Sequence, residues 1–210
     1  MLLDKRTVDM SLRRISALTL ASLAAVMLAH CWPCLADAQN PLVIMQTTKG
    51  TIVMRIYLGL APGTAANFLD LVNRGFYNGL TFHRVENWVI QGGDPNGNGT
   101  GVFIDPQTHQ PRYLALEVSP RLHHNGPGVV AMAHGRSPNS SSCQFYITKK
   151  AAPALDGSYS IFGGVVQGMD VVYNISAGDR ILSAEVAGSG EPRPAAGAPT
   201  QPPPAGDSGF

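Results

Sequence analysis

Histidine is the residue type in this chain best suited to holding a metal ion, because its neutral ring nitrogens are common zinc ligands. Five of the six histidines lie in the central part of the sequence, at positions 83, 109, 123, 124 and 134. Zinc-binding helices place two histidines four residues apart, whereas His123 and His124 are adjacent. We therefore expect solvated or structural histidines and no metal. A metal-dependent hydrolase stays open as a third hypothesis, which metal analysis of the dialysed protein tests.

A group of glycines at positions 92, 93, 97, 99 and 101 is the second feature of chemical interest, since glycine-rich loops can cradle phosphate groups. The group lacks the Lys-Ser/Thr pair of a P-loop and the glycine spacing of a dinucleotide-binding fingerprint. The pattern therefore predicts turns, and it gives no reason to expect a nucleotide cofactor.

Two of the three cysteines, Cys31 and Cys34, form a Cys-Trp-Pro-Cys sequence that superficially resembles a redox motif. They lie between an apolar stretch and a predicted cleavage site, so we expect them to be removed with the leader described next. Cys31 also resembles a lipoprotein processing site, but His30 stands where a small residue should precede the cysteine. Cys143 is then alone, and we expect a small buried hydrophobic residue without an internal disulfide.

The N-terminal segment has the pattern of a leader. Four basic residues precede an apolar stretch from Ile15 to Ala29, and Ala36-Asp37-Ala38 follows as a small-residue cleavage pattern. This order predicts a secretory signal peptide over residues 1–38, and hence a periplasmic or secreted protein. The stretch is shorter than the roughly 20 residues of a membrane-spanning helix, although an uncleaved signal that anchors the protein in the membrane stays open. Translation starting at Met10 stays open as well.

The rest of the chain fits one folded domain and a tail. With 210 residues and 44% hydrophobic residues, the chain can bury one core but not two comfortable ones. Residues 188–210 are mostly Gly, Pro, Ala, Ser and Gln, so they have too few apolar side chains to offset the entropy of ordering. We predict a folded domain over residues 39–187 and a disordered tail over residues 188–210.

Charge gives no reason to expect a nucleic acid or an anionic membrane as partner. The chain has 15 Lys and Arg against 14 Asp and Glu, and the predicted leader contains four of the former and three of the latter. The mature protein then has no net charge, whereas proteins that bind nucleic acids or anionic membranes normally have an excess of basic residues clustered on one surface. We expect no nucleic acid, no stable membrane insertion after signal cleavage and, without sustained apolar heptads, a monomer.

Short apolar segments divided by Gly, Pro and Asn turns must position any site in this domain. Ile52, Met54 and Ile56 alternate with other residues, which predicts a strand that pairs with the preceding one around Lys49-Gly50. The segments expected as strands are 42–46, 51–57, 81–85, 88–91, 129–133, 144–148, 160–166 and 181–186. The pattern indicates a mainly β domain with a closed or nearly closed antiparallel sheet.

Two helices are expected beside these strands. Between Pro62 and Gly75, helical spacing relates four apolar residues, which are Ala65, Phe68, Leu69 and Val72. A shorter helix is expected over residues 169–175, with one apolar face made by Met169, Val172 and Tyr173. Both helices would cover the ends of the sheet.

A series of motifs runs along this domain in order: Phe82-His83-Arg84-Val85, Gln91-Gly92-Gly93-Asp94, Gly126-Pro127-Gly128, Pro138-Asn139-Ser140, Gln144-Phe145-Tyr146-Ile147 and Leu155-Asp156-Gly157. In order and spacing the series resembles the cyclophilin family of peptidyl-prolyl cis-trans isomerases, here in an exported, bacterial form. The resemblance implies a closed eight-stranded antiparallel β-barrel capped by two α-helices. It also implies an enzyme without a cofactor that accelerates rotation about X-Pro bonds in proline-containing polypeptides.

The chemistry implied by the resemblance needs a hydrogen-bond donor for the twisted amide and a pocket that holds the proline ring. Arg84 matches the family's catalytic arginine, which can hold a substrate carbonyl and donate toward the prolyl nitrogen. Gln91, the second catalytic residue, and Gln144, a substrate-binding residue, match polar groups that orient the peptide backbone. Alternatively, Arg84 forms only a surface salt bridge, and the two glutamines only connect strands.

The resemblance also implies an apolar proline pocket. Its wall residues would be Trp88, Val89, Ala133, Tyr146 and Leu155, where the family usually has Phe, Met, Ala, Phe and Leu. Val89 is shorter than Met, and the segment from Arg84 to Gln91 is one residue shorter than in the best-known members. The main rival hypothesis is therefore a peptide-binding or chaperone module that has lost efficient catalysis.

Two further departures concern inhibitor binding. Tyr159, counted here with the substrate-binding residues, stands where many family members have His, and Tyr can still donate a hydrogen bond. Ala154 stands where the members that bind cyclosporin tightly have Trp. We therefore expect catalytic activity together with weak cyclosporin binding.

Overall fold

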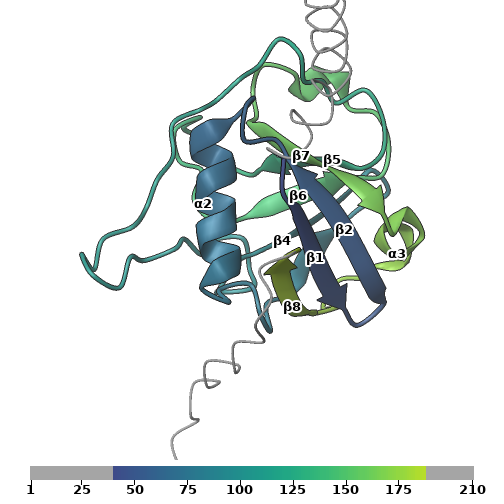
Figure 1. Ribbon diagram of the computed structural model, residues 1–210, viewed down its shortest axis with the longest axis horizontal. Coiled ribbons are helices and arrows are strands. Elements are labelled where there is room, and N and C mark those ends of the chain that lie inside the picture. The colour runs from purple at the N-terminus through teal and green to yellow at the C-terminus, as the bar shows by residue number, and fades with distance from the viewer. Residues whose placement is uncertain (1–39, 188–210) are drawn as a thin grey trace, which may run out of the picture. The chain divides into compact units, whose positions relative to one another are not determined.

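The computed structural model describes residues 40–187, so the predicted signal peptide and tail lie outside the described residues. Two helices and one short 3-10 helix are interspersed with the strands (Figure 1). In chain order the elements are β1 (Leu42–Thr47), β2 (Gly50–Ile56), α2 (Pro62–Asn73), β3 (Phe82–Val85), β4 (Val89–Gly92), β5 (Val129–Met132), β6 (Phe145–Thr148), η1 (Pro153–Leu155), β7 (Ile161–Gln167), α3 (Met169–Asn174) and β8 (Ile181–Val186). All eight predicted strands and both predicted helices are confirmed, with bounds that differ by at most two residues.

The strands form one sheet in the order β3-β4-β6-β5-β7-β2-β1-β8, and each neighbouring pair is antiparallel. Between the edge strands β3 and β8, the described residues contain only a single bridge, which joins Thr81 and Arg180. Next to this bridge, Phe82 N donates to Asp179 O at 2.9 Å. The sheet is therefore an open half-barrel whose edges meet at one end, and the fully closed barrel expected from the sequence is not shown.

The core lies on one face of this curled sheet. Alternation along β2 places Ile52, Met54 and Ile56 there, each fully buried as predicted. Aromatic rings fill its centre, with Phe68 of α2 4.9 Å from Phe162 of β7 between ring centroids. α2 contacts β7 and β8, whereas α3 contacts β2 on another side of the sheet (Figure 1).

In each helix, a residue that the predicted spacing placed on the buried face is not fully buried. In α2, Leu71 is fully buried instead of Leu69, which is only half-buried, because Leu71 follows Phe68 by three residues on the face that meets the sheet. In α3, Val172 is fully buried and Tyr173 is 52% exposed. Consecutive helical residues point about 100° apart, and α3 packs on β2 with the side that carries Val172, so Tyr173 faces solvent.

The N-terminus of α2 is held by a distant carboxylate. Pro62 begins the helix, and Ala61 at the N-cap position provides no side-chain hydrogen bond. Instead, Glu117 Oε1 accepts from Gly63 N at 3.0 Å and Oε2 accepts from Thr64 N at 2.6 Å. Burial raises the pKa of Glu117, but the hydrogen bonds from Thr64 and Gly63 outweigh it and hold that pKa below its usual value. This contact joins the long β4–β5 connection to α2.

Candidate functional site

Strand register aligns the predicted site residues across the sheet. Arg84 of β3 pairs with Gln91 of β4, and Gln91 pairs with Tyr146 of β6. Tyr146 in turn pairs with Ala131 of β5. Directly opposed residues share a face, so these four side chains form a row on one side of the sheet. Ile90, between Val89 and Gln91, lies on the other face and belongs to the main core.

A second, smaller apolar cluster supports this face. Its buried members are Val89, Ala131, Tyr146 and Ile161, and Trp88, Ala133, Leu155 and Tyr159 are among the half-buried residues that pack on them. A pocket of about 540 Å³ opens over the cluster. It is lined by His83, Arg84, Trp88, Val89, Gln91, Asn98, Gly99, Ala133, His134, Tyr146, Leu155 and Tyr159. Every predicted site residue except Gln144 therefore lines one pocket, including Trp88 and Val89, despite the shorter loop before them.

Arg84 lies at the rim of this pocket, where its guanidinium has several partners. Nη1 donates to Gln91 Oε1 at 3.2 Å, and Nε donates to Glu86 Oε1 at 2.8 Å. Nη2 forms an ion pair with the same Glu86 oxygen at 2.8 Å. Arg84 thus does form the surface salt bridge that was the alternative interpretation, and it also faces the pocket. The two interpretations are not exclusive.

Gln144 lies beside the pocket rather than in it. Its Oε1 accepts from Gln91 Nε2 at 2.9 Å, and its Nε2 donates to Gly99 O at 3.1 Å and to Gly101 O at 2.9 Å. Gln144 lines a neighbouring pocket of about 240 Å³, which shares Gln91, Gly99, Ala133 and His134 with the larger one. A polar chain therefore runs from Arg84 through both glutamines to the loop between the two pockets.

Glycines of the group that follow β4 build this loop as predicted, whereas Gly92 is the last residue of β4 itself. Gly93, Gly97 and Gly99 have positive φ angles of 83°, 66° and 88°, which glycine adopts without strain. The carboxylate of Asp94 accepts from the backbone N–H groups of Asn96, Asn98 and Gly99. Burial raises the pKa of Asp94, but these backbone hydrogen bonds outweigh it and lower the pKa overall. The turn thus presents Asn98 and Gly99 to the pocket.

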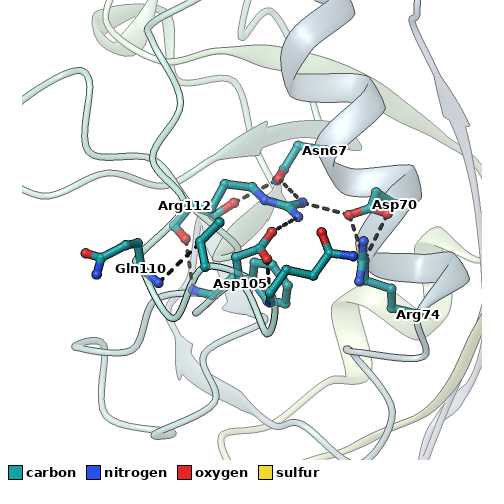
Figure 2. Close-up of polar contacts among 10 residues, drawn as sticks. Asn67, Asp70, Arg74, Asp105, Gln110 and Arg112 are labelled. Carbon is teal, nitrogen blue, oxygen red and sulfur yellow. Dashed lines mark hydrogen bonds and ion pairs between the residues drawn. The ribbon is translucent and has the colours of Figure 1, made fainter.

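The next part of the long connection is fastened to α2 by Arg112. Figure 2 shows its guanidinium between Asp70 of α2 and Asp105 of the connection. Nη1 lies 2.7 Å from Asp70 Oδ2, and Nη2 lies 2.8 Å from Asp105 Oδ2. The hydrogen bonds to Asp70 and Asp105 raise the pKa of Arg112 above its usual value. These contacts hold the segment that leads to Tyr113, a residue of the smaller pocket.

Sequence reasoning missed a buried chain of polar groups beneath the pocket. His124 is fully buried, and its Nδ1 lies 2.8 Å from Asp156 Oδ1 while its Nε2 lies 2.8 Å from the Tyr146 hydroxyl. Hydrogen bonds from the His124 backbone and then from its ring lower the pKa of Asp156 to about 2. Burial is the main cause that raises the pKa of Tyr146. Sequence reasoning named each member separately, with Asp156 in the motif Leu155-Asp156-Gly157 and Tyr146 where the family usually has Phe, but no pattern in the sequence joins them to His124.

His134 and Cys143 also have clear positions. His134 stacks on Tyr159 with ring centroids 4.3 Å apart, so it forms part of the pocket wall that the motifs did not identify. Cys143 is free and fully buried, as predicted, and burial raises its pKa to about 12. Such a thiol is protonated at neutral pH and therefore a poor nucleophile.

The histidines of the central region are not gathered around a common centre. Within residues 40–187, no three His, Cys, Asp or Glu side chains come together as a metal site would require. The same residues contain no helix with the length and hydrophobicity to cross a bilayer. Four of the five central histidines have other contacts. His83 lines the pocket, His123 and His124 both bond to Asp156, and His134 bonds to Ser158 O.

Comparison with known proteins agrees with this geometry. The sequence profile of the family described as "Cyclophilin type peptidyl-prolyl cis-trans isomerase/CLD" matches residues 42–194. Peptidyl-prolyl cis-trans isomerase-like 1 of Rhizopus delemar is 43% identical over 131 residues, which are 62% of this chain and 76% of that protein. Peptidyl-prolyl cis-trans isomerase ppi1 of Schizosaccharomyces pombe is 42% identical over 133 residues, which are 61% and 81% of the two chains.

The fold has a solved counterpart too. The crystal structure of a cyclophilin-type peptidyl-prolyl cis-trans isomerase from Cryptosporidium parvum matches with a TM-score of 0.63 and 28% identity, over 70% of this chain and 97% of that one. These relatives are eukaryotic, so they lend no support to the bacterial and exported parts of the prediction. The profile spans more than half of the chain and includes every predicted site residue. The chain therefore belongs to the cyclophilin family and is a peptidyl-prolyl cis-trans isomerase.

Proposed function

We propose that this enzyme accelerates X-Pro rotation by Arg84-assisted twisting of the amide while the proline ring rests in the pocket over Val89 and Tyr146. The observation that carries the proposal is the position of Arg84, whose guanidinium lies at the rim of a pocket of about 540 Å³ that opens over the apolar cluster around Val89 and Tyr146. Within residues 40–187, its contacts with Glu86 and Gln91 use three of its five N–H groups, which leaves two for a substrate.

The chemistry asked of these groups is modest. The barrier to X-Pro rotation is about 18–20 kcal/mol because the amide is conjugated, and it falls when the nitrogen pyramidalises and loses that conjugation. A guanidinium N–H directed at this nitrogen stabilises the twisted state more than either planar isomer, which is the requirement for catalysis. Gln91 fixes Nη1 of Arg84 from the next strand, so the donor is oriented before substrate binds.

The apolar wall supplies the grip on the ring. Val89 and Tyr146 are 1% and 5% exposed, so the floor of the pocket is well buried, while Trp88 and Leu155 are half-buried at its edges. A proline ring fits such a surface, and the flanking peptide would reach the smaller pocket beside Gln144. The substrates are accordingly flexible, proline-containing polypeptide segments. With the predicted leader, we place these substrates among exported proteins in the periplasm or outside the cell.

The test is the cis-to-trans rate of an Ala-Pro peptide with purified wild-type protein and Arg84→Ala. A related structure, that of the Cryptosporidium parvum enzyme, was determined in the presence of the dipeptide Ala-Pro, which supports this choice of peptide. Removing a donor that acts in the transition state should lower kcat/KM by about a hundredfold or more. An unchanged rate in Arg84→Ala would show that the guanidinium takes no part.

Arg74→Ala is the matched control. Arg74 also forms an ion pair with a carboxylate, Asp70, and its side chain is 41% exposed against 45% for Arg84. It lies at the end of α2 and is not among the residues that line the pocket. Both variants therefore lose an exposed ion pair of an arginine, but only Arg84→Ala should lose activity.

A further inference from the structure

Glu86 occupies a position that the sequence motifs did not point to. It begins the three-residue connection Glu86-Asn87-Trp88 between β3 and β4, and its N–H donates to Val89 O at 2.9 Å, which closes the connection. Its Oε1 accepts from Arg84 Nε at 2.8 Å, and its Oε2 accepts from Trp88 Nε1 at 2.7 Å. One carboxylate therefore connects the arginine at the pocket rim with the tryptophan in the pocket wall.

We propose that Glu86 is a positioning residue for catalysis, which sets the orientation of the Arg84 guanidinium over the proline pocket. The inference rests on the proposed role of Arg84. The carboxylate holds the Nε and Nη2 side of the guanidinium, while Gln91 holds Nη1. A planar group held at two of its edges has one orientation, and its remaining N–H groups then point in fixed directions.

Several contacts distinguish this ion pair from an ordinary surface pair. Both side chains are nearly half exposed, and an isolated pair of that kind holds its geometry weakly. Here the indole N–H of Trp88 fixes the second carboxylate oxygen, and Arg84 Cζ lies 5.6 Å from the centroid of the Trp88 ring. Arg74 and Asp70 on α2 provide a contrast, because within residues 40–187 no aromatic ring lies over the Arg74 guanidinium.

The charge of Glu86 is maintained by the same contacts. Hydrogen bonds from Arg84 and then from Trp88 lower the pKa of Glu86 below its usual value, so the carboxylate is ionised at neutral pH. An ionised carboxylate accepts strong, short hydrogen bonds from both donors. The connection thus places the carboxylate of its first residue between Arg84 and Trp88.

The experiment is a double-mutant cycle with Glu86→Gln and Arg84→Ala, in which kcat and peptide affinity are measured separately by exchange NMR on an Ala-Pro peptide. The amide that replaces the carboxylate in Glu86→Gln keeps one acceptor oxygen for Arg84, but its nitrogen cannot accept from Trp88. We expect Glu86→Gln to lower kcat by about three- to tenfold with affinity nearly unchanged, because positioning affects the transition state more than binding. In the Arg84→Ala background, Glu86→Gln should have no further effect.

Glu185→Gln, the same chemical change at an exposed position of β8, is the matched control and should keep the wild-type rate. If Glu86→Gln lowers the rate equally with and without Arg84, or lowers only the affinity, Glu86 acts on the pocket and the inference is wrong. An unchanged kcat in Glu86→Gln also contradicts it. If instead Arg84→Ala alone keeps the full rate, the proposed catalytic role of Arg84 fails first, so the two failures are distinguishable.

Discussion

Replacement of Tyr146 by Phe should lower stability while leaving catalysis nearly intact. The Tyr146 hydroxyl lies 2.8 Å from Nε2 of His124, whose side chain is fully buried. Without the hydroxyl, this ring nitrogen loses its partner in a place that water does not reach, which costs about 1 to 3 kcal/mol. For a domain of this size, that loss corresponds to a decrease in Tm of about 3 to 10 °C.

The aromatic ring itself remains in Tyr146→Phe, so the wall of the proline pocket keeps its shape. We therefore expect kcat/KM on an Ala-Pro peptide within about twofold of wild type, since only the hydroxyl that contacts the buried His124 is lost. Thermal and urea unfolding followed by circular dichroism measure the stability, and the isomerisation rate is measured below the Tm of both proteins.

Tyr173→Phe provides the matched control, because it removes a tyrosine hydroxyl from a side chain of α3 that is 52% exposed. Its Tm should stay within error of wild type. Unchanged stability in Tyr146→Phe would show that the bond to His124 makes no net contribution. Loss of activity with full stability would mean that the hydroxyl acts on the substrate, contrary to the geometry.

Three more outcomes follow from particular contacts. Asp156→Asn should make the free energy of unfolding less dependent on pH in acid, which urea unfolding at several pH values checks. The pKa of Asp156 is about 2 in the folded protein against a usual 3.8, so the ionised carboxylate stabilises the fold above pH 3.8 and this stabilisation is lost as the pH falls toward 2. Glu117→Ala removes the acceptor for the first N–H groups of α2 and should cost about 1 kcal/mol in urea unfolding. Cyclosporin should inhibit the purified enzyme only weakly, because Ala154 replaces the tryptophan of strongly binding family members; tight inhibition in a titration would contradict this expectation.

Most of the fold could be predicted because its strands are short and rich in branched or aromatic residues, and because β1 and β2 alternate between buried and less buried residues. Ile52, Met54 and Ile56 show this alternation, and the structure places all three in the core. Closure of the barrel could not be predicted in the same way, since it depends on whether β3 and β8 meet along their length. Local patterns carry no information on such a pairing, and the described residues show a single bridge there.

The pocket residues could be identified because the motifs that contain them keep a fixed order, and strand register then brings Arg84, Gln91 and Tyr146 together. Glu86 and His124 could not be identified from sequence. Both lie in irregular connections whose side-chain directions depend on tertiary contacts rather than on a period of two or 3.6 residues. His134 was expected only to be a solvated or structural histidine, because nothing in the sequence shows that it stacks on Tyr159.

The central claim is that Arg84 accelerates rotation of a proline amide bound in the pocket, rather than only contributing to binding. Exchange NMR on an Ala-Pro peptide with wild-type protein and Arg84→Ala tests it directly, because the method reports the affinity and the cis-trans exchange of bound peptide in one experiment. We predict fast exchange with wild-type protein, and exchange slowed by about a hundredfold or more in Arg84→Ala while the affinity changes little. Equal exchange rates in the two proteins at equal affinity would contradict the claim.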